Sequence, residues 1–219
     1  LLLLLLLLLL LLLLGVVVCS PVSVQQVIRI ITDSPSSTCA LDPIPTCLLK
    51  RCKDELAPII ARVINMSFEQ GSYPDVFKHA HVKPLLKNGK LDVEDMKNYR
   101  PIANLKFLSK TVERAAAIQI QSYTAENNLN ATMQSAYRKN HSVETALLRV
   151  SNDLLLNVDK GLEAVLLLLD YSAAFDTIRH DTLLHRLHVR FGFCGTALRW
   201  LESYITGRSQ SVVIEGQAS

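Results

Sequence analysis

The stretch VLLLLDYSAAFDTIRHDTLLHRL, residues 165–187, sets five consecutive apolar side chains directly before a carboxylate, Asp170. An apolar run of this length without alternation is typical of a strand that is buried on both faces. The residues that follow predict a helix over 177–190, with Gly192 as its stop signal. The stretch therefore predicts a rigid strand that holds one acidic side chain at its end.

An aspartate in this position has two uses. Its carboxylate can accept hydrogen bonds from the backbone of Ser172 or Ala173 and so cap a turn. Alternatively, a carboxylate on a stiff strand can hold a hard divalent cation through its oxygens. Phosphoryl transfer needs such cations, one to activate the attacking hydroxyl and one to neutralise the leaving pyrophosphate. The residues alone leave both uses open.

The rest of the chain mixes helices and strands without a strict strand–helix–strand repeat, which indicates the α+β class. The capping signals Ser23 with Gln26, and Ser142, mark the starts of two helices. Two strands on either side of a turn at 87–89 predict a hairpin. We expect helices over 23–31, 46–53, 56–69, 108–128, 142–161 and 196–205, and further strands over 79–86, 100–105 and 211–216.

Charge and cysteine content restrict the class of protein. The net charge is only +3, yet residues 78–114 hold nine Lys and Arg against four Asp and Glu. This basic segment suits a polyanionic ligand, although a solvated lysine-rich surface is the alternative. The five cysteines are an odd number and form no C-x-x-C pair, which argues against a disulfide framework or a zinc ribbon. No P-loop or Gly-x-Ser-x-Gly pattern supports an NTPase or a hydrolase.

The chain opens with a low-complexity tract, residues 1–20, whose first 14 residues are all leucine. The tract is long enough to cross a bilayer, but it lacks the basic n-region of a secretory signal. We interpret it as a translated simple repeat or the edge of a fragment, with a membrane segment as the alternative. It is set aside from the fold.

Two pairs of side chains have both a structural and a functional interpretation. Trp200 and Tyr204 lie at i and i+4, a spacing that favours a packing pair over a platform for stacking bases. His185 and His188 lie at i and i+3, and we interpret them as part of a polar helix face, not as zinc ligands.

The quoted stretch resembles the first catalytic motif of reverse transcriptases of non-LTR retrotransposons, in particular those of the jockey type. Further blocks resemble the same family in the same order, so that the resemblance covers residues 21–219. These blocks are SSTCALDPIPTCLLKRC (36–52), VKPLLKNGKLDVEDMKNYRPIANLKFLSKTVERA (82–115), QSAYRKNHSVETALLRVSNDLL (134–155) and GTALRWLESYITGRSQSVVIEG (195–216).

The resemblance implies a right-hand polymerase fold, with fingers and an incomplete palm in residues 78–219, preceded by a helical N-terminal extension in residues 21–77. It implies an RNA-directed DNA polymerase that adds dNTPs to a primer 3′-hydroxyl with two Mg²⁺ ions. The implied partners are an RNA template and a DNA primer, with no obligate protein partner. An intracellular location, nuclear or cytoplasmic, is favoured.

The resemblance also assigns roles to residues of the quoted stretch. Asp170 matches the first metal-binding aspartate, and Tyr171 matches the residue whose backbone carbonyl helps to hold the metal. Phe175 matches the bulky gate that packs under the incoming sugar and disfavours a 2′-hydroxyl.

Three basic residues match positions outside that stretch. Lys87 and Arg100 fall where the fingers hairpin of such enzymes clamps the triphosphate. Arg138, in the QSAYR block, matches a segment near the templating base and is expected to contact nucleic acid.

One family feature is absent from these 219 residues, because no two aspartates are adjacent. The family uses an adjacent aspartate pair to complete the two-metal site, and one carboxylate cannot hold two metals in catalytic geometry. We therefore expect this chain alone to catalyse little or nothing. One alternative is a non-catalytic nucleic-acid-binding remnant of such a polymerase. Another is a membrane-anchored interaction module, which rests on the leucine tract alone.

Overall fold

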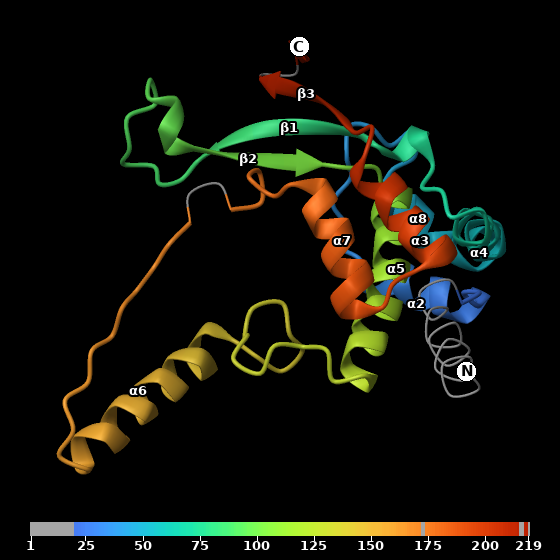
Figure 1. The fold of residues 1–219 in the computed structure, drawn as a ribbon. Coiled ribbons are helices and arrows are strands. Elements are labelled where there is room, and N and C mark those ends of the chain that lie inside the picture. The colour runs from blue at the N-terminus through green and yellow to red at the C-terminus, as the bar shows by residue number, and fades with distance from the viewer. Residues whose placement is uncertain (1–19, 172–173, 215–216, 219) are drawn as a thin grey trace, which may run out of the picture. The chain divides into compact units, whose positions relative to one another are not determined.

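The computed structural model describes residues 20–171, 174–214 and 217–218 (Figure 1). The chain divides into two compact units. Unit 1 combines the described residues up to Tyr123 with those from Arg179 onward, and unit 2 is Thr124–Ile178. Helices and strands are mixed, which confirms the α+β class. The right-hand polymerase arrangement stays a prediction.

The sheet of unit 1 has four strands in the order β2-β1-β3-β4. Strands β1 (His79–Leu86) and β2 (Tyr99–Asn104) form an antiparallel hairpin in which Leu85 lies opposite Arg100 (Figure 1). Strand β3 (Ser209–Ile214) runs parallel to β1, and the short β4 (Gln217–Ala218) pairs with β3. The predicted hairpin and the predicted C-terminal strand are confirmed.

The predicted helices of unit 1 are confirmed with small shifts in their bounds. They are α2 (Val24–Asp33), α3 (Thr46–Arg51), α4 (Lys53–Gln70), α5 (Phe107–Glu126), α7 (His180–Phe191) and α8 (Gly195–Ile205), with the end of α5 in unit 2. Ser23 and Gln26 form the expected capping box of α2. Gly192 ends α7 in the left-handed conformation, as its stop signal predicts. Helix α7 begins three residues later than expected.

The aromatic part of the unit 1 core lies where α4 packs against α8. Trp200 of α8 is 2% exposed, and its ring meets those of Phe68 and Tyr73 edge to face, each at 5.5 Å between centroids. Its indole nitrogen donates a hydrogen bond to the Ser67 hydroxyl at 2.8 Å. The ring also stacks on Tyr204 at 5.5 Å, which confirms the predicted packing pair.

Apart from the last residues of α5, the described part of unit 2 contains one regular element, helix α6 (Val143–Asp159). Ser142 caps its first turn in a reciprocal arrangement with Thr145, so the predicted start of this helix is confirmed. Gly161 follows its end in the left-handed conformation, with φ of 71°. No residue of α6 is buried. Local end signals therefore define this helix, without a packed face.

The prediction of a buried strand over Val165–Leu169 is wrong. Residues 162–171 form no strand, and their side chains are exposed, Val165 at 94% and Leu168 at 80%. A strand needs hydrogen-bonding neighbours at its edges, and a doubly buried strand also needs cover on both faces. No strand among the described residues pairs with this segment. The apolar composition alone therefore does not produce the strand.

No helix within the described ranges is both long and apolar enough to cross a bilayer. The leucine tract, residues 1–14, lies outside those ranges.

Candidate functional site

Lys87 begins the segment 87–98 that joins β1 to β2, and Arg100 lies just beyond the other end of this segment, in β2. Because Leu85 is opposite Arg100 and Lys87 is two residues beyond Leu85, the two cations share one face of the hairpin. The Lys87 amide donates to the carbonyl of Asn98 at 2.8 Å, and its ammonium donates to the carbonyl of Lys97 at 2.7 Å. Both side chains are exposed, and neither forms an ion pair with a described acidic residue. Both cations are thus available to an anion.

The same face of β1 carries His79, His81 and Lys83, at alternate positions leading to Lys87. The His79 ring nitrogen Nδ1 lies 3.0 Å from the Ser209 hydroxyl, and the two imidazole rings meet edge to face at 5.6 Å. No cluster of three or more His, Cys, Asp or Glu side chains suited to a metal occurs among the described residues. This face is therefore basic and polar.

Asp170 and Tyr171 lie in an extended segment of unit 2, at the end of the described range 20–171. Both are exposed, Tyr171 at 80%. The alternative role of Asp170, capping the backbone of Ser172 or Ala173, falls on residues outside the described ranges. An exposed carboxylate and a neighbouring carbonyl are hard oxygen donors of the kind that Mg²⁺ prefers. These donors fit the ion in kind, but no cluster of three or more metal-binding side chains includes Asp170 among the described residues.

Phe175 lies in the turn at 174–177, with 74% of its surface exposed. Its ring meets that of Tyr137 edge to face, with 6.4 Å between centroids. Unit 2 thus brings the QSAYR block next to the predicted sugar gate. This contact joins two segments that are far apart in the sequence.

Arg138 follows Tyr137, which has a φ of 60° in the left-handed region. One guanidinium nitrogen of Arg138, Nη1, donates to the carbonyls of Ala131 at 3.3 Å and Gln134 at 3.2 Å. The arginine that we expect to contact nucleic acid therefore also braces its own loop. The six predicted site residues form two sets, Lys87 and Arg100 in unit 1 and the other four in unit 2.

The sequence patterns did not predict a partly buried polar cluster around Glu113. Burial raises the pKa of Glu113, while Arg208, 3.8 Å away, opposes this shift. The Tyr73 hydroxyl lies 2.8 Å from the Ser109 hydroxyl and donates to Glu113 at 3.4 Å. The Arg208 guanidinium lies over the Tyr204 ring, 4.9 Å from its centroid, and burial raises the pKa of Tyr204 to about 12. These residues come from separate segments, so no local spacing could reveal the cluster, which ties the start of β3 to α5 and α8.

Comparison with known proteins gives consistent matches. Residues 85–218 match the family model described as "Reverse transcriptase (RNA-dependent DNA polymerase)". That range contains Lys87, Arg100, Arg138, Asp170, Tyr171 and Phe175.

Curated relatives come from mobile elements of Drosophila. The chain is 28% identical over 192 residues to "Probable RNA-directed DNA polymerase from transposon X-element" of Drosophila melanogaster, covering 88% of the chain and 21% of the relative. It is 25% identical over 172 residues to "Probable RNA-directed DNA polymerase from transposon BS" of the same species, covering 78% and 19%. It is 24% identical over 197 residues to "RNA-directed DNA polymerase from mobile element jockey" of Drosophila funebris, covering 90% and 21%. The chain thus spans about a fifth of the length of these relatives.

Proposed function

The chain belongs to the reverse transcriptase family, and we propose that it forms the fingers and the first palm segment of an RNA-directed DNA polymerase of a non-LTR retrotransposon. The observation that carries this proposal is the family match over residues 85–218, which contains the motif around Asp170. We assign residues 78–219 to the polymerase domain and residues 21–77 to a helical extension. The proposed substrates are dNTPs, an RNA template and a DNA primer.

Asp170 and the carbonyl of Tyr171 are the groups that would hold Mg²⁺ in the complete protein. Divalent ions bound there would activate the primer hydroxyl for attack and stabilise the negative charge on the leaving pyrophosphate. The exposure of Asp170 supports this role, because its carboxylate is accessible to solvent ions. A two-metal site would also need further carboxylates, and the 219 residues contain no adjacent aspartates.

Lys87 and Arg100 are proposed to contact the triphosphate. Their shared face, their exposure and the lack of a described acidic partner support the proposal. Fixed cations aimed at phosphoryl oxygens stabilise the charge that develops during transfer. Phe175 would contact the sugar by shape, and its edge-to-face contact with Tyr137 supports its placement beside the block that carries Arg138.

The exposed cations Lys87 and Arg100 can bind phosphate without a metal, which favours a second candidate, a nucleic-acid-binding remnant without catalysis. Such a protein would bind RNA mainly through phosphate charge. Its affinity would then fall steeply with salt, and no Mg²⁺-dependent incorporation would accompany binding.

A polymerase assay on the complete open reading frame that contains this sequence separates the two candidates. We expect Mg²⁺-dependent dNTP incorporation on an RNA template, and a loss of about 10²–10³-fold in Asp170→Asn, because the substitution removes a charge that stabilises transfer. The matched control is Asp153→Asn, an exposed aspartate of α6, which should keep full activity. Equal activity in Asp170→Asn and the parent would refute the role of Asp170. RNA binding without incorporation by the parent would favour the remnant.

A further inference from the structure

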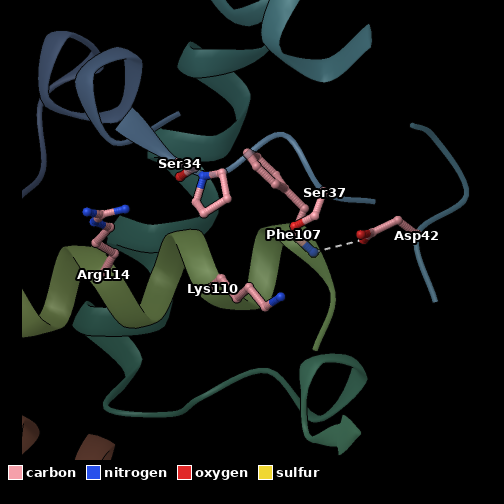
Figure 2. A pocket seen from close by; sticks show the side chains of 7 residues that line it. Ser34, Ser37, Asp42, Phe107, Lys110 and Arg114 are labelled. Atoms are coloured by element: carbon pink, nitrogen blue, oxygen red, sulfur yellow. Dashed lines mark hydrogen bonds between the residues drawn. The ribbon is translucent and has the colours of Figure 1, made fainter. Parts of the chain in front are cut away.

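A cavity of about 140 Å³ lies between the loop that follows α2 and the first turns of α5 (Figure 2). Its basic side chains are Lys110 and Arg114, and the loop contributes Ser34 and Ser37. None of the six residues with a proposed polymerase role lines it. The loop also lies outside the residues that match the family model. The cavity is therefore a separate feature of unit 1.

The charges that line this cavity are not balanced. Lys110 and Arg114 are four residues apart on α5, so they lie on the same face of the helix, where like charges repel. Neither forms an ion pair with a described acidic residue. Asp42 is the one acidic residue in the lining, and its carboxylate accepts the Phe107 amide at 2.8 Å (Figure 2). Asp42 therefore caps the start of α5, and the charges of Lys110 and Arg114 remain available to a ligand.

The two serine hydroxyls of the loop differ in whether they are free to donate a hydrogen bond to a ligand. Ser34 donates its proton to the Ile30 carbonyl at 2.6 Å, so its hydroxyl is already used. Ser37 is exposed, and only its backbone carbonyl is engaged, as the acceptor for the Thr46 hydroxyl at 3.1 Å. Ser37 is therefore the neutral donor that can add to the two cations. Two cations and a hydroxyl match the oxygens of a phosphate group.

A second cavity of about 290 Å³ lies between α2 and α5. Arg29 and Arg114 supply its basic side chains, and Asp33 its acidic one. Arg114 lines both cavities. A ligand with more than one phosphate could therefore contact Arg114 and reach both spaces.

We propose that Lys110, Arg114 and Ser37 form a phosphate-binding pocket on unit 1. The ligand chemistry is a phosphate group, either a phosphodiester of a polynucleotide or a free phosphate such as that of a nucleotide. The pocket is independent of the proposed polymerase site, because it uses none of its residues. Its function is to hold a phosphate at the junction of α2 and α5.

Binding to the 219-residue chain tests the pocket with two probes, a fluorescent single-stranded RNA followed by anisotropy and inorganic phosphate followed by calorimetry. Lys110→Gln and Arg114→Gln should each weaken binding of at least one probe about tenfold, the value of a lost charge-assisted hydrogen bond. If the probe is RNA, each variant should also reduce the slope of log affinity against log salt by about 0.7. Arg62→Gln, an exposed arginine of α4 that lines neither cavity, is the matched control.

A second variant keeps the test valid if removing a cation disturbs α5. Ser37→Asp leaves both cations in place and adds a negative charge to the loop, so it should weaken the same probe. Loss of RNA binding alone identifies a phosphodiester, and loss of phosphate binding alone identifies a free phosphate. Binding by all three variants that equals binding by Arg62→Gln, for both probes, would overturn the pocket. That result would leave the Asp170 assay unaffected, so the two proposals fail separately.

Discussion

Units 1 and 2 contain similar apolar residues but differ in whether these residues are buried. Ile64 of α4 is fully buried in unit 1, whereas Leu148 of α6 is 71% exposed in unit 2. No apolar side chain in the described part of unit 2 is buried. Hydrophobic composition therefore gives only a tendency to bury, and the presence of a packing partner decides whether burial occurs.

The same contrast affects the candidate site. Lys87 and Arg100 stand on a hairpin that is hydrogen-bonded to β3 within a packed unit. Asp170 stands on a segment without strand partners among the described residues. A metal site needs side chains held by packing and by supporting hydrogen bonds. Because the apolar side chains of unit 2 are exposed while many of unit 1 are buried, we expect substitutions of buried residues in unit 1 to lower stability and substitutions in unit 2 to change it little.

The largest expected effect compares two truncations. Ile64→Ala should lower the free energy of unfolding by about 2–5 kcal/mol, because it leaves a cavity in the core. Leu148→Ala should change it by less than about 0.5 kcal/mol, because the side chain is already in water. Urea unfolding followed by circular dichroism measures both. Equal losses would mean that α6 is packed in solution, and the contrast between the units would disappear.

An intermediate effect compares two glycines that both have positive φ. At Gly71, φ is 62°, and an added Cβ would lie 3.0 Å from the carbonyl oxygen of Thr196. At Gly161, φ is 71°, and nothing lies within 4 Å of an added Cβ. Left-handed strain alone costs about 1–2 kcal/mol, and the clash adds to it only at Gly71.

We therefore expect Gly71→Ala to lose about 2–3 kcal/mol of unfolding free energy. Gly161→Ala should mainly fray the end of α6. Urea unfolding measures the first loss, and amide chemical shifts at the end of α6 detect the second. A larger global loss from Gly161→Ala would contradict the comparison.

The smallest effect concerns pH. Burial raises the pKa of Glu113 in unit 1, so the folded chain keeps this proton at a pH where the unfolded chain has released it. Its contribution to stability is therefore present at low pH and is lost as pH rises through the folded pKa. In unit 2, the hydroxyl of Ser142 lowers the pKa of Glu144, so that contribution is lost as pH falls.

The free energy of unfolding should decline as pH rises above the ordinary glutamate pKa, and Glu113→Gln should remove part of this decline. Carboxyl carbon shifts, followed by NMR titration, should place the pKa of Glu113 above the ordinary value and that of Glu144 below it. The reverse order would show that Arg208 outweighs burial at Glu113. Glu144→Gln is the paired control, with a small effect of opposite sign.

Sequence patterns located most regular elements because their signals are local. The cap at Ser142, the stop at Gly192 and the turn signal at 87–89 each act over a few residues, and the structure confirms the two helix ends and the hairpin. The prediction of a strand before Asp170 was wrong, because strand pairing depends on residues elsewhere in the chain.

The sequence by itself therefore determined the helices, the hairpin, the family and the identity of the candidate site residues. Tertiary structure alone decided which apolar segments are buried, how Glu113 meets Arg208, and how Lys110 and Arg114 come to line a cavity with Ser37. The physical reason is the range of the forces involved. Capping and backbone conformation act between neighbours in sequence, whereas burial and charge pairing depend on segments that only folding brings together.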